Sequence, residues 1–91
     1  MLKDSLFDFT ILWDKVEKIY EKAFYYEERG NFSRAIKLWN QAIELKPHFS
    51  YFYYNRGIVY DKLGQHKRAL NDFNEAIKLN PKYKNADVYY Y

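Results

Sequence analysis

The side chains that could do metal or redox chemistry are few in this chain of 91 residues, and their spacing builds no site. The sequence has no cysteine and two histidines, His48 and His66, which stand 18 positions apart. Neither histidine has a pair of carboxylates at the spacing that a metal site would use. We therefore expect surface or structural roles for both histidines, no metal site and no bound cofactor.

Two pairs of neighbouring acids remain as candidates for general acid–base catalysis, Glu27 with Glu28 and Asp72 with Glu75. That chemistry needs a carboxyl group whose pKa is tuned by burial or by a charged neighbour. Nothing apolar or catalytic converges on either pair, and acids beside Lys or Arg on a helix surface are ordinary. We expect no catalytic residue, and hence a protein that is not an enzyme.

Aromatic residues are the strongest departure from ordinary composition, with 11 Tyr, 7 Phe and 2 Trp. The excess must be shared between a core and a contact surface. The formal net charge of +3 is too small to indicate nucleic-acid binding without a clustered patch, and the basic residues alternate with acids such as Glu44 and Asp72. Nucleic-acid binding is therefore a third hypothesis, and we expect no nucleic-acid partner.

The cellular location is predicted from what the composition lacks. An absence of cysteine fits a reducing compartment. No run approaches the ~18 apolar residues of a membrane helix, and the opening stretch has acids at Asp4 and Asp8 where a secretory signal would be basic and then apolar. We expect a cytoplasmic protein with no targeting segment and no membrane partner.

The elements that must position these side chains follow from an internal repeat. When the sequence is shifted by 34 residues, several positions become identical: Tyr26/Tyr60, Gly30/Gly64, Arg34/Arg68, Ala35/Ala69, Asn40/Asn74, Ala42/Ala76, Ile43/Ile77, Leu45/Leu79 and Pro47/Pro81. Trp39 and Phe73 are a conservative pair at the same offset. This period is typical of a solenoid built from helical hairpins.

The repeated residues resemble the tetratricopeptide repeat, in which small, aromatic, Gly, Ala and Pro residues stand at fixed offsets. One copy has Ala23, Tyr26, Gly30, Ala35, Trp39, Ala42 and Pro47, and the next has Gly57, Tyr60, Gly64, Ala69, Phe73, Ala76 and Pro81. The resemblance implies an all-α fold of tandem helix-turn-helix hairpins in a short right-handed solenoid. We predict one domain over 1–91, with an N-terminal helical extension (1–15), repeat 1 (16–49), repeat 2 (50–83) and a partial repeat 3 (84–91).

Turn residues predict where each helix ends. Gly30 and Gly64 suit the left-handed conformation that terminates a helix, because they have no side chain to clash there. Pro47 and Pro81 stop the second helix of each hairpin, since proline lacks the amide donor. The small residues at the positions named above let the helices approach closely.

The two ends of the chain lie outside the complete repeats. Apolar residues from Leu6 to Ala23 recur at spacings of three and four, which favours one long helix over a separate short capping helix, with Asp4 or Ser5 as its N-cap. The third copy stops before its partner helix, so either the natural chain continues past Tyr91 or another copy of the chain supplies the missing surface.

The resemblance also implies that the first helices of the repeats line a concave, peptide-binding groove. Carried over by position, its residues are Glu17, Tyr20, Glu21, Phe24, Glu27 and Glu28 from repeat 1, then Tyr51, Tyr54, Asn55, Ile58, Asp61 and Lys62 from repeat 2, and Asn85, Val88 and Tyr89 from the partial repeat. The two complete repeats contribute five acids and one base to this set. We therefore expect an acidic, aromatic groove that binds a protein or peptide carrying basic and aromatic residues.

Two further interpretations concern single features. The alternative function is self-assembly into a structural homo-oligomer through the N-terminal helix or the Tyr-rich end, because large exposed apolar patches mark such contacts.

Arg56 corresponds to Lys22 in the first copy. We expect both long side chains to lie across their neighbours with their charged heads in water.

Overall fold

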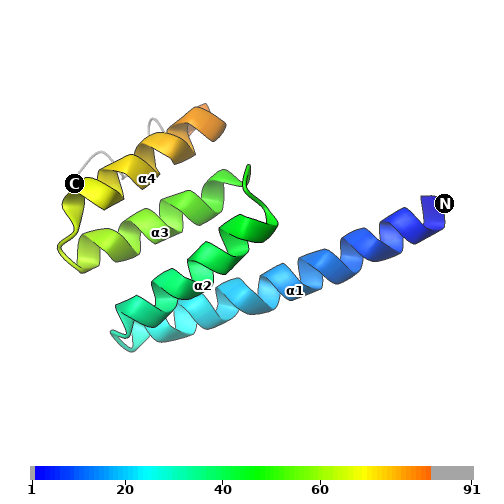
Figure 1. The fold of residues 1–91 in the computed structure, drawn as a ribbon, viewed down its shortest axis with the longest axis horizontal. Helices are drawn as coiled ribbons and strands as arrows, with labels where there is room; N and C mark the ends of the chain where they lie inside the picture. Colours follow the sequence, from blue (N-terminus) through cyan, green and yellow to red (C-terminus); the bar gives the residue numbers. More distant parts are fainter. Residues whose placement is uncertain (1, 83–91) are drawn as a thin grey trace.

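A computed structural model shows four α-helices in two antiparallel hairpins (Figure 1). The structure describes residues 2–82, with side chains from residue 8 onward. The helices are α1 (Leu2–Glu28), α2 (Phe32–Leu45), α3 (Ser50–Lys62) and α4 (His66–Leu79), and the described part of the chain has no strand. The expected all-α repeat fold is confirmed, while the residues assigned to a partial third repeat, 84–91, lie outside the described part.

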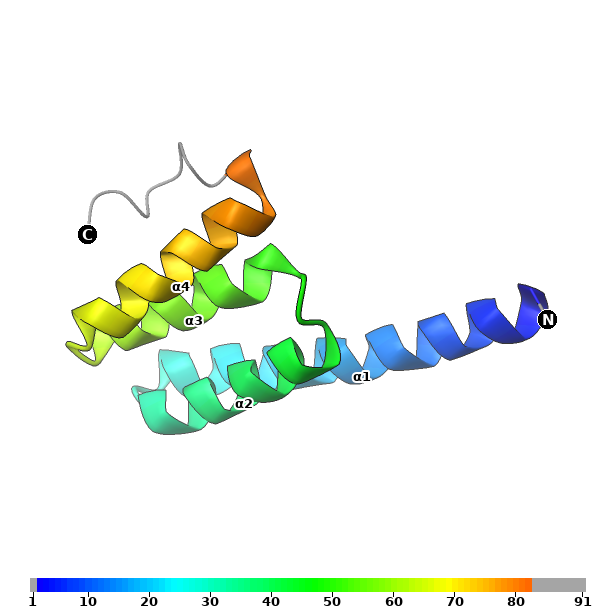
Figure 2. The same ribbon diagram turned by 45° about the horizontal axis from the view of Figure 1, so that its top comes forward.

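Neighbouring helices along the chain are also neighbours in space. The main contacts join α1 to α2, α2 to α3, and α3 to α4, so the second hairpin stacks on the first (Figures 1 and 2). The described chain is elongated, measuring 46 × 30 × 17 Å along its principal axes. This is the stacked-hairpin arrangement of a helical solenoid.

The two hairpin turns have the same geometry. Gly30 and Gly64 adopt positive φ angles of 76° and 79°, as their position after a helix predicts. In each turn the next amide reaches back over five residues, from Asn31 to the Tyr26 carbonyl and from Gln65 to the Tyr60 carbonyl, both at 2.9 Å. The 34-residue repeat is therefore reproduced in the backbone hydrogen bonds.

The first helix is about twice as long as the others, with 27 residues against 13 or 14. Its C-terminal half pairs with α2, whereas its N-terminal half projects beyond the other helices (Figures 1 and 2). One continuous helix replaces the alternative of a separate capping helix. The expected N-cap at Asp4 or Ser5 is wrong, because the helix already begins at Leu2.

The core is made from the apolar stripes that the spacing predicted. Its fully buried members are Val16, Ala23, Ala35, Trp39, Ala42, Phe52 and Val59. A smaller cluster around Ala69 and Phe73 holds the second hairpin together. The tightest approach is at Gly57, where an added Cβ would lie 2.6 Å from the Phe73 ring, so only glycine fits there without movement.

Candidate functional site

The residues predicted to line a groove lie on α1 and α3, the first helix of each hairpin. The Tyr20 ring from α1 contacts the Tyr51 ring from α3 edge-on, with centroids 6.5 Å apart at 83°. Phe24, one turn further along α1, lies 6.3 Å from Tyr20. Side chains 31 positions apart in sequence thus meet in one aromatic patch, which we call the α1/α3 patch (Tyr20, Phe24 and Tyr51).

Not all of the predicted residues are equally available to a partner. Tyr51 is 37% exposed, while Asn55 is buried and its amide donates a 2.8 Å hydrogen bond to the Tyr51 carbonyl. Tyr54 and Ile58 are half-buried and pack against the Ala69/Phe73 cluster of the second hairpin. Of the predicted residues on α3, those at the two ends of the helix are therefore the most exposed.

Two of the five acids are already engaged within the chain. Lys62 donates a 2.8 Å hydrogen bond to Glu27, which joins the end of α3 to the end of α1. Asp61 contacts the imidazole of His66 at the start of α4. The structure therefore pairs two of the predicted acids within the chain at the turn end of the set.

The other three acids, Glu17, Glu21 and Glu28, all lie exposed on α1. Among residues 8–82 no hydrogen bond or ion pair engages their carboxylates. Glu17 and Glu21 stand close to Tyr20, whose pKa is raised above its usual value by partial burial first and then by these two negative charges. The acidic potential is thus concentrated beside the α1/α3 patch.

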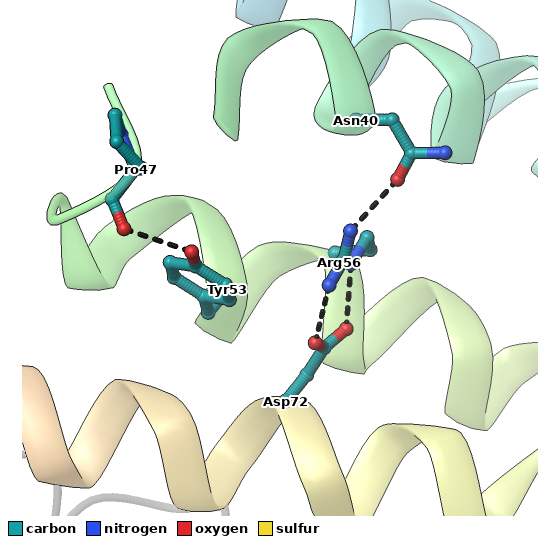
Figure 3. A network of polar contacts seen from close by, with 5 residues as sticks. All are labelled: Asn40, Pro47, Tyr53, Arg56 and Asp72. Carbon is teal, nitrogen blue, oxygen red and sulfur yellow. Dashed lines mark hydrogen bonds and ion pairs between the residues drawn. The ribbon is translucent and has the colours of Figure 1, made fainter. Parts of the chain in front are cut away.

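A network around Arg56 joins three helices and was missed by the sequence analysis (Figure 3). The Arg56 guanidinium donates two hydrogen bonds to the Asp72 carboxylate on α4, at 2.8 and 2.7 Å, and a third to the Asn40 side chain on α2, at 2.8 Å. Its side chain is 21% exposed and that of Asp72 is 7% exposed. The expectation that the Arg56 head lies in water is wrong, because Asp72 offers a bidentate partner.

Aromatic rings complete the surroundings of this guanidinium. The Tyr53 and Tyr60 rings lie 5.6 and 5.8 Å from the Arg56 Cζ atom. The Tyr53 hydroxyl donates a 2.8 Å hydrogen bond to the Pro47 carbonyl, which ties α3 to the start of the preceding loop (Figure 3). The Asp72 hydrogen bonds are the largest cause of a raised Arg56 pKa, so the charge is held permanently.

The sequence did contain a signal for the Arg56 network. At the 34-residue offset, Arg56 replaces Lys22 and Asp72 replaces Leu38, so the second copy has an anion and a guanidinium where the first has an apolar residue and an ammonium. The two positions lie on facing helices of one hairpin. A comparison of paired differences, rather than of single residues, would have predicted the contact.

A second aromatic group was predicted only as a helical stripe. Trp13, on the projecting side of α1, contacts Phe49 at the start of α3 edge-on, with centroids 5.3 Å apart. Phe9 lies 6.1 Å from Trp13, and the Lys46 ammonium lies within 5.4 Å of the Phe9 centroid and 5.1 Å of the Trp13 centroid. The ring contacts of Phe49 and Lys46 were not predicted from the sequence, because loop residues have no periodicity to reveal their partners.

Residues 8–82 offer no group of three His, Cys, Asp or Glu side chains that could hold a metal ion. Nor does any described helix combine the length and the apolar character needed to cross a membrane.

Two family models match this chain, one described as tetratricopeptide repeat over residues 50–83 and one described as TPR repeat over residues 25–64. Together they cover residues 25–83, which include α2, α3, α4 and only the last turn of α1. No match was found among the curated proteins.

Solved structures agree with the family models. The Sgt2 TPR domain from Aspergillus fumigatus is 30% identical, with a TM-score of 0.74 over 76% of this chain and 46% of that one. A crystal structure of MamA is 27% identical, with a TM-score of 0.70 over 72% of this chain and 39% of that one. The chain therefore spans less than half the length of these structures.

The family models, the hairpin geometry and the structural neighbours point to the same kind of molecule. Tetratricopeptide repeats form protein–protein interaction modules, and they bind proteins or peptides. The chain belongs to the tetratricopeptide repeat family.

Proposed function

We propose that this chain is a non-enzymatic interaction module that binds a basic segment of a partner protein along α1 and α3. The observation that carries the proposal is the position of Glu17 and Glu21 beside the Tyr20 and Tyr51 rings. Carboxylates attract a cation, and ring faces stabilise it further once it is near. The partner is a protein or peptide with Lys or Arg residues next to aromatic or aliphatic ones, and no nucleic acid or membrane takes part.

The structure supports a narrower version of this site than the family pattern alone. Glu27 is paired with Lys62 and Asp61 with His66, so these acids have less to offer a ligand. The cation of the partner is therefore placed at Glu17 and Glu21, toward the middle of α1. The absence of cysteine supports a reducing, cytoplasmic setting for this interaction.

Binding is tested with fluorescein-labelled peptides rich in Arg and Phe, measured by fluorescence anisotropy at low and high salt. Glu21→Lys should weaken binding about tenfold or more, since it replaces an attraction by a repulsion. Glu44→Lys, an exposed acid on α2 with the same charge change, is the matched control and should leave the affinity unchanged. Equal effects of both variants would show that net charge, and not this site, governs binding.

Self-association is the second candidate, and one observation favours it. Phe9 and Ile11 on the projecting part of α1 are 55% and 51% exposed, so this part of the helix leaves large apolar side chains uncovered on two sides. A homo-oligomer formed through this helix predicts a mass that rises with concentration in light scattering and falls to a monomer in a Phe9→Ser, Ile11→Ser variant. The partial third repeat, 84–91, was predicted as an alternative contact and lies outside the described residues.

A further inference from the structure

The ring contacts of the α1/α3 patch continue beyond repeat 1 onto the N-terminal extension of α1. Tyr51 contacts Phe49 at 6.2 Å, Phe49 contacts Trp13 at 5.3 Å, and Trp13 contacts Phe9 at 6.1 Å. A continuous row of rings thus runs from Tyr20 to the projecting part of α1. We call this row the aromatic row (Phe9, Trp13, Phe49, Tyr51 and Tyr20).

The outer faces of the row are open. Phe9, Phe49 and Tyr51 are 55%, 39% and 37% exposed, whereas Trp13 and Tyr20 are half-buried and form its floor. Phe9, Trp13 and Tyr20 fall within about 40° of one another around the α1 axis at 3.6 residues per turn. The row is therefore one surface and not a set of scattered rings.

The two ends of the row differ in charge. Glu17 and Glu21 stand at the Tyr20 end, and Tyr20 is raised in pKa partly by their charges. At the other end the Lys46 ammonium lies against the Phe9 and Trp13 rings. A cation is attracted to the first end, and the second end repels it but still accepts an apolar side chain.

The distance between the ends fixes the spacing in a partner. Phe9 and Tyr20 are eleven residues apart on one helix, which corresponds to about 16 Å at 1.5 Å per residue. An extended peptide covers that distance in about five residues at 3.3 Å per residue.

We propose that the partner segment has two anchors: Lys or Arg for Glu17, Glu21 and the Tyr20 ring, and a large apolar side chain, about five residues away, for the Phe9/Phe49 end. The inference rests on the proposed function and adds a second contact outside the repeats. The cation brings the segment to the surface, and the apolar anchor fixes its position along the row.

Three kinds of labelled peptide test the two-anchor segment in fluorescence anisotropy. One carries an Arg pair and a Phe-Leu pair five residues apart, prepared in both orders; the second has Ser in place of Phe-Leu, and the third has Ser in place of the Arg pair. The two-anchor peptide, in at least one order, should bind about tenfold more tightly than either single-anchor peptide.

The protein provides a matched pair of variants for the same assay. Phe9 and Ile11 are almost equally exposed, but two positions along a helix turn Ile11 by about 200° away from the row. Phe9→Ala should weaken the two-anchor peptide about fivefold to tenfold and leave the Arg-only peptide unchanged, while Ile11→Ala changes neither. Circular dichroism of both variants checks that α1 keeps its helix.

The outcomes separate the two proposals. If no peptide binds, the proposed function and the two-anchor inference both fall. If the Arg-only peptide binds as tightly as the two-anchor peptide, or if Phe9→Ala and Ile11→Ala act alike, the inference alone falls and the basic-segment function stands.

Discussion

The first hairpin places Lys22 and Leu38 where the second places Arg56 and Asp72. Lys22 is exposed and Leu38 packs against the apolar core, whereas Arg56 and Asp72 form a mostly buried, bidentate ion pair. The equivalent positions of the two hairpins are thus stabilised differently. The first hairpin uses apolar packing, and the second uses an ion pair whose two charges depend on each other. The difference shows where the chain tolerates substitution and where it does not.

Arg56 of this ion pair also forms a hydrogen bond to the first hairpin, which an apolar side chain could not do. Arg56 reaches across to Asn40 of the first hairpin while it holds Asp72 of the second. Directional hydrogen bonds of this kind permit fewer arrangements than apolar packing. The Arg56 network therefore adds a directional contact between the second hairpin and the first.

The largest effect should come from removing one partner of this pair. Asp72→Ala leaves a mostly buried guanidinium without its anion and should lower the free energy of unfolding by about 3 kcal/mol or more. Leu38→Ala, at the equivalent position of the first hairpin, should cost only about 1–2 kcal/mol because that side chain is half-buried. Urea unfolding followed by circular dichroism measures both.

Transplanting the residues of the first hairpin tests the comparison directly. The double variant Arg56→Lys, Asp72→Leu should recover part of the loss, since the anion gives way to an apolar side chain and the flexible lysine can extend its ammonium into water, as the exposed Lys22 does in the first hairpin. A double variant as unstable as Asp72→Ala would mean that the hairpins are not interchangeable at these positions.

A smaller effect is expected at the closest helix approach. Gly57→Ala brings a Cβ within 2.6 Å of the Phe73 ring and should cost about 1–2 kcal/mol, after the gain in helix propensity offsets part of the overpacking. The first hairpin has Ala23 at the same position, fully buried and accommodated. Ala23→Gly should therefore also destabilise, by about 1–2 kcal/mol, through lost helix propensity and the loss of a buried methyl group. Thermal unfolding of the two variants tests whether adding a Cβ at position 57 and removing one at position 23 both lower the stability.

Substituting the turn glycine should lower the free energy of unfolding equally in the two hairpins. Gly30→Ala and Gly64→Ala each force a side chain into a left-handed conformation, which costs about 1 kcal/mol, with nothing else within 4 Å of the new Cβ. The Asn variants should cost less, because Asn adopts this conformation more readily. Unequal losses at Gly30 and Gly64 in urea unfolding would reveal a contact specific to one turn.

The smallest effect is expected for Glu17 and Glu21, which lie beside Tyr20 in the first hairpin. The second hairpin has no acids at the equivalent positions. The pKa of Tyr20 is raised in the folded state, so the stability it contributes is present below about pH 10 and is lost as the pH rises through the folded pKa. Glu17→Gln with Glu21→Gln should lower that pKa toward its ordinary value and make the alkaline loss smaller. Tyrosinate absorbance and alkaline unfolding of the double variant provide the check, and an unchanged titration would show that burial alone raises the pKa.

Much of the fold could be predicted because it is periodic. The 34-residue offset located both glycine turns and both proline stops, and the spacing of apolar residues predicted that α1 continues through the extension. Periodicity has no information about the first residue of that helix, which begins at Leu2 and not after Asp4 or Ser5.

The candidate site was less predictable because its charges depend on contacts between distant residues. Glu27 and Lys62 are 35 positions apart, and no local pattern shows that they pair. The row from Tyr51 to Phe9 likewise passes through Phe49, a residue between two helices whose neighbours only the stacked hairpins determine. Composition predicted an excess of aromatic residues outside the core, and the ring contacts place several of them in one row.

The unbroken backbone of α1 has a kinetic consequence. Because one helix connects the projecting Phe9 to the Tyr20 region, the two ends of the row keep a fixed separation and cannot fold away from each other. A segment caught at one end then meets the other at an effective concentration on the order of millimolar, so rebinding competes with escape. Even modest contacts at each end would therefore combine into a long residence time.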